Sequence, residues 1–263
     1  MENPAVVLVT GASRGLGRGV ALELAKAGFS VAIHCGRNVE AAEEAQGLCR
    51  DAASNPAQRF EIVSGDIGVA ADREALFAAT LEKFGHLDAL VNNAGITSPG
   101  RKDITEAREE DFDTVISVNL KGPFFLSQLA VGYWRENPDA SRIPTGYKLV
   151  FVSSISSDTV SLNRGDYCIS KAGLSMANQL WGARLAEEGI QTIEFRPGIM
   201  LTDMTSGVKD KYDKLIEEGL VPQKRWGTPE DTGKAVKAFL SGDFPFTTGD
   251  VLYIDGGFHL KRL

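Results

Sequence analysis

The sequence predicts a single α/β domain of the doubly wound type, with helices on both faces of a parallel sheet of about seven strands. Short, nearly continuous apolar runs alternate with helix-type segments along the 263 residues. The first of these runs leads directly into a glycine-rich turn and then a helix. No linker, repeat or low-complexity segment interrupts the alternation, so residues 1–263 are expected to form one Rossmann-type domain.

The first strand is expected over residues 6–10 (VVLVT), an apolar run typical of a strand buried on both faces. Gly11, Gly15 and Gly17 follow it, and a helix over 18–27 comes next. In this context small residues let the backbone approach a pyrophosphate, to which the helix N-terminus presents free N–H groups. The pattern therefore predicts a dinucleotide site, and a purely structural glycine turn is the alternative.

The second strand, over 29–35, ends where the adenosine ribose of such a cofactor would lie. An acid at this end suits the 2′-hydroxyl of NAD, whereas an arginine suits the 2′-phosphate of NADP. The chain places His34 and Arg37 here, with Arg14 in the nearby turn and no carboxylate. We therefore expect NADP(H) as the preferred cofactor and NAD(H) as the alternative, in which Arg37 is a plain helix-entry residue.

The third and fourth strands both end in polar or small residues. Asp66 follows the third strand, 60–63, and could accept a hydrogen bond from an adenine amino group or cap the helix that begins near Ala71. The fourth strand, 87–91, runs into Asn92-Asn93-Ala94-Gly95, at the edge where ligands bind in open α/β sheets. Further helices are expected over 38–52, 109–118 and 124–134, with Asn119 between the last two.

The fifth strand, 149–152, ends in two serines and is followed by a helix that carries Tyr167 and Lys171. Residues four apart share one helix face, so the Lys171 ammonium can lie beside the phenol and lower its pKa from roughly 10. A tyrosine tuned in this way can act as a general acid or base, and Ser154 can direct its hydroxyl to the same point. A chance spacing, with a surface tyrosine and a solvated lysine, is the alternative.

The remaining elements complete the sheet. A sixth strand, 189–195, runs into Arg196-Pro197-Gly198, and the final strand lies within 248–257. Between them, the segment 202–222 contains an amphipathic piece, which predicts either a lid over the substrate or a plain surface helix. A further helix ends at Leu240.

Composition excludes several classes of function. A net charge of −7 argues against nucleic acid or an anionic membrane as the main partner. No apolar run approaches the roughly 18 residues of a membrane span, and the N-terminus lacks a signal-peptide pattern. The three cysteines are scattered and are expected to be reduced thiols of a cytoplasmic protein. The three histidines are isolated, so we expect no metal site.

Taken together, these motifs resemble those of the short-chain dehydrogenase/reductase family. Thr10-Gly11-x-x-x-Gly15-x-Gly17, Asp66, Asn92-Asn93-Ala94-Gly95, Asn119, Ser154, Tyr167-x-x-x-Lys171 and Pro197-Gly198 stand in the family's order and spacing. The interval of 13 residues to Tyr167 selects Ser154 over Ser153. The match covers almost the whole chain.

The resemblance implies a role for each catalytic residue. Tyr167 would be the general acid or base, and Lys171 would lower its pKa and hold the nicotinamide ribose. Ser154 would orient the substrate oxygen, and Asn119 would position a water that links Lys171 with solvent. The residues expected to bind the cofactor are Gly11, Ser13, Arg14, Gly15, Leu16, Gly17, His34, Arg37, Asp66, Ile67, Asn93, Ala94, Gly95, Tyr167, Lys171, Pro197, Gly198, Ile199 and Thr202.

Within the family, the chain looks most like the 3-oxoacyl-[acyl-carrier-protein] reductases, notably in segments 16–28 and 118–122. Three features depart from them: Arg196, a longer polar loop over 135–147, and Trp181. Arg196 could form a structural salt bridge or contact an acidic substrate, and Trp181 could pack in a subunit interface or in the core.

Three functions follow from this resemblance. The first is NADP(H)-dependent reduction of a 3-oxoacyl thioester or similar small ketone. The second is oxidation of a sugar, polyol or sugar acid, which Arg196 and the polar loop would suit. The third is a catalytically silent cofactor-binding regulator, which would be expected to lack the tyrosine or the lysine.

The resemblance also implies partners and an assembly. An acyl-carrier protein is a candidate partner. The expected assembly is a homotetramer packed through the helix with Lys171 and Trp181 and through the last strand. The candidate docking residues for a carrier protein are Arg135, Arg142, Arg164 and Arg184.

Overall fold

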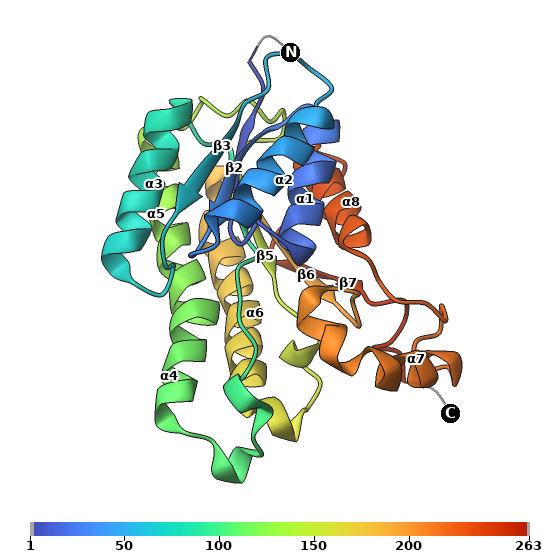
Figure 1. Cartoon of the computed structure of the whole chain (residues 1–263). Coiled ribbons are helices and arrows are strands. Elements are labelled where there is room, and N and C mark those ends of the chain that lie inside the picture. The colour runs from blue at the N-terminus through green and yellow to red at the C-terminus, as the bar shows by residue number, and fades with distance from the viewer. Residues whose placement is uncertain (1–2, 262–263) are drawn as a thin grey trace.

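The computed structural model describes residues 3–261 as one seven-stranded parallel sheet with helices on both faces (Figure 1). The strand order is β3-β2-β1-β4-β5-β6-β7, so the direction of winding reverses between β1 and β4. In such sheets ligands bind beyond the carboxyl ends of the strands at this reversal. The strands are β1 (Val6–Val9), β2 (Ser30–Cys35), β3 (Phe60–Ser64), β4 (Ala89–Asn92), β5 (Lys148–Val152), β6 (Gln191–Pro197) and β7 (Asp250–Ile254).

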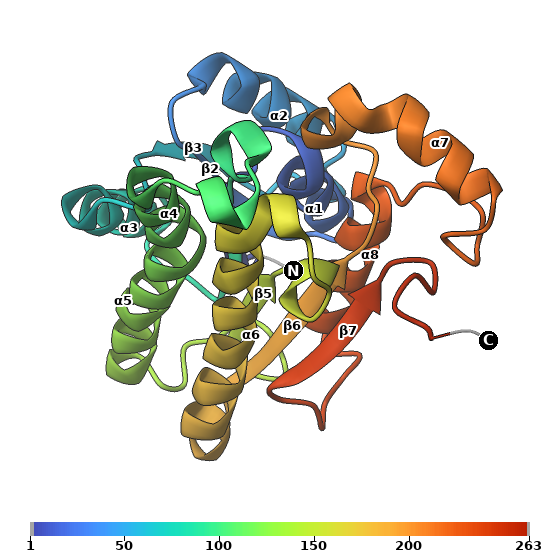
Figure 2. The same ribbon diagram turned by 90° about the horizontal axis from the view of Figure 1, so that it is seen from below.

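Two layers of helices enclose the sheet, as the view in Figure 2 shows. On one face lie α1 (Gly15–Lys26), α2 (Val39–Asp51) and α8 (Pro229–Leu240). On the other face lie α3 (Ala70–Phe84), α4 (Glu109–Ile116), α5 (Gly122–Glu136) and α6 (Gly165–Leu185). The short helix α7 (Lys209–Glu217) lies at the periphery, on the side of the carboxyl ends of the strands (Figure 1).

Residues of the central strands are buried on both faces. In β1, Val7 and Val9 pack in the cluster that includes α1, α2 and α8, while Val6 and Leu8 pack in the cluster that includes α3, α5 and α6. This alternation follows from the two-residue period of a strand. Because both sets are apolar, the sequence shows a continuous apolar run, as expected for a parallel sheet. The predicted fold is therefore confirmed.

Three local features differ from the prediction. Helix α1 begins at Gly15, because the glycine turn itself forms the first helical turn. Asn119 lies in a π-helical turn, Ser117–Lys121, that joins α4 to α5. Helix α5 continues to Glu136, so the predicted polar loop begins only after that residue.

The polar loop that precedes β5 lies at the amino ends of the strands, away from the edge where ligands bind. The backbone N–H of Arg142 donates to Asp88 just before β4, and its guanidinium donates to the Pro4 carbonyl just before β1. Tyr147 stacks on Trp134, with ring centroids 5.2 Å apart. The suggestion that this loop suits a polar substrate is therefore wrong, because the loop faces the opposite end of the sheet.

The segment between β6 and α8 has a small apolar cluster of its own. Ile199, Ile216 and Val221 are buried together, with Tyr212 and Trp226 packed against them. The Trp226 Nε1 donates to Asp213 at 2.7 Å. The interpretation of residues 202–222 as a lid remains a prediction. Within residues 3–261, no helix is both long and apolar enough to span a membrane.

Candidate active site

The glycine turn has the shape and polarity that a dinucleotide pyrophosphate requires. Arg14 is the N-cap of α1 but makes no side-chain capping bond, and the first turn carries no acid. The N–H groups there are therefore open to an anion. Gly11 and Gly15 have φ values of 66° and 54°, which disfavour other residues. A Cβ on Gly17 would lie only 2.2 Å from the Gly11 carbonyl oxygen, so this close approach also needs glycine.

His34 stabilises the glycine turn through hydrogen bonds of its two ring nitrogens. The Gly11 N–H donates to His34 Nδ1 at 3.0 Å, and His34 Nε2 lies 2.9 Å from the Gly65 carbonyl oxygen. Nδ1 must therefore be the unprotonated nitrogen, and Nε2 carries the proton. Burial lowers the pKa of His34 against the opposing effects of the Gly65 carbonyl and the Asp66 charge, which favours the neutral ring. Both ring nitrogens are used within the protein, so the ring offers no free nitrogen to a cofactor, and the expected role of His34 in cofactor binding stays a prediction.

Two arginines are accessible near the expected position of the adenosine ribose, one at the start of α1 and one after β2. Arg14 and Arg37 are exposed and form no ion pair within residues 3–261. Arg18 instead pairs with Glu44 at 2.9 Å. Asp66 accepts the Gly68 N–H at one carboxylate oxygen, and its second oxygen has no hydrogen-bond partner among the described residues. The capping alternative for Asp66 is wrong, because the N-cap of α3 is Val69 and no side chain caps that helix.

Thr10 fixes the turn after β4 to the end of β1. Its hydroxyl oxygen accepts the backbone N–H groups of Asn93 and Ala94, both at 2.9 Å. The Asn93 side chain donates to the Thr10 carbonyl at 2.8 Å, so it stabilises the cofactor turn rather than pointing into open space. Thr10 belongs to the glycine motif but was not among the expected site residues. Its place between an apolar run and Gly11 is the signal that could have identified it.

Asn119 links this turn to α6. Its amide donates to the Ile96 carbonyl at 2.9 Å and to the Ser170 hydroxyl at 3.1 Å, and its oxygen accepts the Ile96 N–H at 2.8 Å. A Cβ on Gly95 would lie 3.3 Å from this amide oxygen and 3.5 Å from Lys171 Nζ. The predicted internal hydrogen bonding of Asn119 is confirmed, and the structure places the amide close to Lys171.

Tyr167, Lys171 and Ser154 converge at the carboxyl end of β5. Lys171 Nζ lies 5.7 Å from the centroid of the Tyr167 ring and donates to the Val152 carbonyl at 3.1 Å. Ser154 makes a side-chain hydrogen bond with Tyr167. The Arg164 guanidinium lies 5.5 Å from the centroid of the same ring. The pair predicted from the four-residue spacing therefore forms.

The pKa of Tyr167 differs from the expectation. Burial raises it, and the Ser154 hydrogen bond and the Arg164 charge only partly oppose this. Burial also lowers the pKa of Lys171 to about 8, against the charge of Glu194. The expected lowering of the Tyr167 pKa by Lys171 is thus wrong for the protein alone, because desolvation of the phenol dominates. Near neutral pH, Tyr167 is a protonated acid.

Arg196 is fully engaged inside the protein. Its Nε donates to Glu194 at 2.7 Å, one terminal nitrogen donates to Asp158 at 2.7 Å and to Tyr253 at 2.8 Å, and the other donates to Ser175 at 2.6 Å and to Glu194 at 3.3 Å. These bonds use all the donors of a guanidinium. The structural interpretation of Arg196 is confirmed, and the alternative contact with an acidic substrate is wrong.

The remaining expected cofactor residues border the same edge. Gly198 donates to the Ile254 carbonyl at 3.0 Å, and a Cβ on Gly15 would lie 3.8 Å from the Thr202 methyl group. A cavity of about 390 Å³ opens here between α1, Thr202 and the start of α8. Ser13, Ile67 and Ile199 are buried, Leu16 packs against the core, and Pro197 ends β6.

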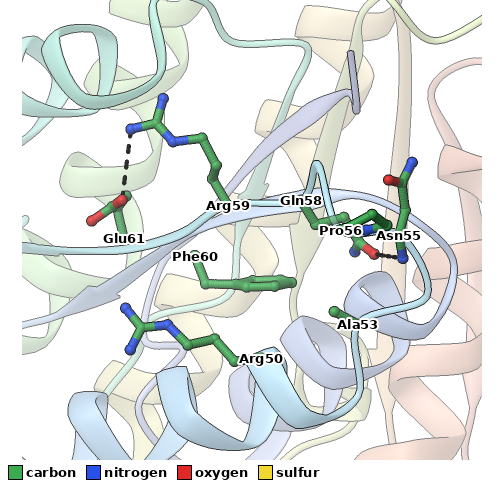
Figure 3. Close-up of a pocket in the computed structure, with 8 residues that line it drawn as sticks. All are labelled: Arg50, Ala53, Asn55, Pro56, Gln58, Arg59, Phe60 and Glu61. Carbon is green, nitrogen blue, oxygen red and sulfur yellow. Dashed lines mark hydrogen bonds and ion pairs between the residues drawn. The ribbon is translucent and has the colours of Figure 1, made fainter. Parts of the chain in front are cut away.

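A second cavity lies at the amino end of β3, lined by Arg50, Arg59 and Phe60 among others (Figure 3). Arg59 pairs with Glu61 at 3.6 Å beside it. Because all the strands are parallel, this cavity lies at their amino ends, whereas Tyr167 lies at their carboxyl ends. It takes no part in the site described above.

A glycine turn shaped for a dinucleotide, next to a serine, tyrosine and lysine that can hold a carbonyl oxygen, defines a nicotinamide-dependent oxidoreductase. Comparison with known proteins agrees. The family profile described as Enoyl-(Acyl carrier protein) reductase matches residues 11–259. The crystal structure of a 3-oxoacyl-[acyl-carrier protein] reductase from Brucella melitensis in complex with NAD is 42% identical, with a TM-score of 0.91 over 99% of both chains.

Two curated relatives have similar coverage. A 3-oxoacyl-[acyl-carrier-protein] reductase from Staphylococcus aureus is 30% identical over 254 residues, 96% of this chain and 97% of that protein. A 2-dehydro-3-deoxy-D-gluconate 5-dehydrogenase from Escherichia coli is 30% identical over 254 residues, 96% of this chain and 94% of that protein. The chain therefore belongs to the short-chain dehydrogenase/reductase family. It is an NAD(P)-dependent oxidoreductase that closely resembles 3-oxoacyl-[acyl-carrier-protein] reductases, so the silent-regulator interpretation is set aside.

Proposed function

We propose that the protein is an NADP(H)-dependent carbonyl reductase whose substrate is a 3-oxoacyl thioester or a similar small ketone. The observation that carries this proposal is the convergence of Ser154, Tyr167 and Lys171 beside Gly95, next to the glycine turn. The reductase names of several relatives support the substrate class.

The reaction needs a proton donor at the substrate oxygen. Bound NADPH would supply hydride to the carbonyl carbon. Ser154 and Tyr167 donate hydrogen bonds to the carbonyl oxygen, and Tyr167 transfers its proton as negative charge develops there. The raised pKa of Tyr167 suits this role, because the phenol is protonated at neutral pH. Lys171 then stabilises the phenolate and holds the nicotinamide ribose.

Asn119 completes the proton path in this proposal. Both N–H groups of its side chain are occupied by Ile96 and Ser170. A water that links Lys171 with solvent would therefore bind to the amide oxygen of Asn119 or to its backbone carbonyl. The glycines at the turn, with Arg14, Thr202 and their neighbours, would hold the cofactor phosphates.

Replacement of Tyr167 by Phe tests the catalytic assignment. The variant lacks the transferable proton and should lose turnover by roughly 10²- to 10⁴-fold. Its dissociation constant for NADPH, measured by fluorescence titration, should stay near that of the wild type, because the cofactor turn is unchanged. A variant that retains most of its activity would show that another group protonates the substrate.

The preference for NADP(H) rests on two exposed arginines, Arg37 after β2 and Arg14 at the start of α1. Arg37→Gln should raise the dissociation constant for NADPH by about tenfold and leave that for NADH nearly unchanged, because only NADPH carries a 2′-phosphate. Arg50→Gln, near the C-terminal end of α2 and at the cavity of Figure 3, is the matched control. An equal effect of Arg37→Gln on both cofactors would favour NAD(H).

A second candidate function is oxidation of a sugar acid or related polyol, and Arg164 favours it. Only the Nε of this arginine makes a hydrogen bond within the described residues, to Ser161 at 3.3 Å. A guanidinium with free terminal nitrogens beside Tyr167 suits a substrate carboxylate. The similarity to a gluconate-type dehydrogenase points the same way.

A substrate screen with the preferred cofactor separates the two candidates. Acetoacetyl thioesters should be reduced if the first proposal is correct, and Arg164→Gln should then change kcat/KM only slightly. Oxidation of sugar acids that Arg164→Gln abolishes would support the second.

A carrier-protein partner is tested by comparing carrier-bound with free thioesters. Of the four candidate docking arginines, Arg135 and Arg184 both pair with Glu188, and only Arg164 lies near Tyr167.

We also propose a homotetramer, packed through α5, α6 and β7. Met176 and Leu180 on α6 and Phe125 on α5 are large apolar side chains exposed to solvent in a single chain. Trp181 packs instead against the core, with its ring 5.6 Å from that of Phe124.

A further inference from the structure

The strand β6 carries two charged side chains, Glu194 and Arg196, that contact the segments holding the proposed catalytic residues. Glu194 is fully buried and Arg196 is 9% exposed. Residues two apart on a strand share a face, so the two side chains lie next to each other, with Nε and Oε1 2.7 Å apart. A buried ion pair of this kind is weak evidence for stability, because apolar replacements are commonly neutral or stabilising. The surroundings of this pair indicate another role.

Glu194 lies against the segment that carries Ser154, next to residues on both sides of that serine. Ser153 donates its hydroxyl proton to Glu194 Oε1. The Ser157 hydroxyl lies 3.5 Å from the same carboxylate oxygen, and the Ser157 N–H donates to the Ser154 carbonyl at 2.9 Å. The single hydroxyl proton of Ser157 goes to the Lys171 backbone carbonyl, so the buried carboxylate bonds Ser153 and lies beside Ser157 without a bond to it.

Arg196 ties the same segment to α6. It donates to Asp158 at the end of the segment and to Ser175, which lies one helical turn after Lys171. The Ser157 hydroxyl closes the connection by donating to the Lys171 backbone carbonyl at 3.0 Å. The pair therefore joins the segment of Ser154 to the helix of Tyr167 and Lys171.

We propose that Glu194 and Arg196 are positioning residues for the carbonyl chemistry: they fix Ser154 relative to Tyr167, and Glu194 supplies the buried negative charge that keeps Lys171 an ammonium ion. This inference rests on the proposed function. Catalysis needs the reacting groups placed closely, and a misplacement of about 1 Å can cost about a hundredfold in rate. The other titratable groups that face the pair are Lys171 on α6, Asp158 after β5 and Tyr253 on β7.

The test compares Glu194→Gln, Glu194→Asp and Arg196→Lys with the wild type. Glu61→Gln is the matched control, because Glu61 also lies on a strand and pairs with an arginine two residues away, at 3.6 Å. Glu194→Gln and Arg196→Lys should lower kcat by about tenfold or more, while the dissociation constant for NADPH stays within about twofold. The control should match the wild type, and circular dichroism with thermal melting checks that each variant folds.

The pH profile separates positioning from a merely structural role. Removal of the negative charge in Glu194→Gln should move the alkaline limb of kcat/KM for ketone reduction to lower pH, since the Tyr167–Lys171 pair then loses its first proton more readily. Glu194→Asp keeps the charge and should leave the limb in place even where kcat falls. An unchanged kcat in Glu194→Gln, or an unmoved limb, would overturn the proposal.

A readout without substrate keeps this inference distinct from the proposed function. The side-chain methylene signal of Lys171 in lysine-labelled protein, assigned with Lys171→Arg, titrates as the amine loses its proton. It should titrate at lower pH in Glu194→Gln and at the wild-type pH in Glu61→Gln. If the wild-type protein turns over no ketone or alcohol, the proposed function fails. If Lys171 titrates at the same pH in Glu194→Gln as in the wild type, the positioning role itself is refuted.

Discussion

At the scale of single residues, the cofactor turn depends on the protonation state of one buried histidine. His34 accepts a hydrogen bond from the Gly11 N–H and can do so only while Nδ1 is unprotonated. Protonation would place two donors face to face at 3.0 Å. The folded protein therefore resists protonation of His34, in agreement with the lowering of its pKa by burial.

This resistance predicts a loss of stability in acid. The unfolded chain has a histidine pKa of about 6.5, above that of folded His34, so the unfolded state binds more protons below this pH. The free energy of unfolding should therefore fall as the pH drops through about 6.5. His34→Gln should show a shallower fall in urea denaturation between pH 7.5 and 5.5. Equal slopes for the two proteins would mean that His34 does not carry this effect.

At the scale of elements, the entry to α1 depends on a close approach of two backbone segments. Gly17→Ala would place its Cβ 2.2 Å from the Gly11 oxygen and 2.5 Å from the Asn93 amide nitrogen. We expect a loss of about 1–3 kcal/mol of stability, or more, from this overpacking, together with weaker NADPH binding. Gly47→Ala is the control, since a Cβ at this position in α2 meets nothing within 4 Å.

The control should respond in the opposite direction. Alanine in an unobstructed helix interior is favoured over glycine by about 0.5–1 kcal/mol, so Gly47→Ala should raise the melting temperature. Cofactor affinity should not change. If Gly17→Ala has the same melting temperature and the same dissociation constant for NADPH as the wild type, then the glycine turn can shift to accommodate a side chain.

The elements also show what a single sequence can predict. The seven strands and the pairing of Tyr167 with Lys171 follow from local periodicity, and the structure confirms them. The role of His34 could not be predicted, because it depends on Gly65, which is distant in sequence. For Arg196 the sequence offered a structural salt bridge and a substrate contact, and it could not decide between them because the partner Asp158 is also distant in sequence. The position of the polar loop before β5 could not be predicted either, because it depends on contacts with Asp88 and Pro4 at the amino ends of distant strands.

At the scale of the whole molecule, the two ends of the sheet have different roles. The amino ends carry a stabilising polar network in which buried Lys148 donates to the Thr145 carbonyl at 2.9 Å and to Gln191. Burial lowers the pKa of Lys148 to about 8. The carboxyl ends carry the glycine turn and the convergent Ser154, Tyr167 and Lys171, so loops there can vary in substrate recognition without disturbing the other end.

The proposed tetramer is a property of the whole molecule and makes a prediction about its surface. Met176 and Leu180 on α6 are 52% and 56% exposed, and burying them between subunits would remove apolar area from water. A double change to Glu should place buried charges at that interface and convert the tetramer to smaller species in sedimentation velocity experiments. Leu48→Glu is the control, because Leu48 is a leucine 39% exposed on α2, in the opposite helix layer. A tetramer that persists in the double variant, or a wild-type protein that sediments as a monomer, would show that this face is not the interface.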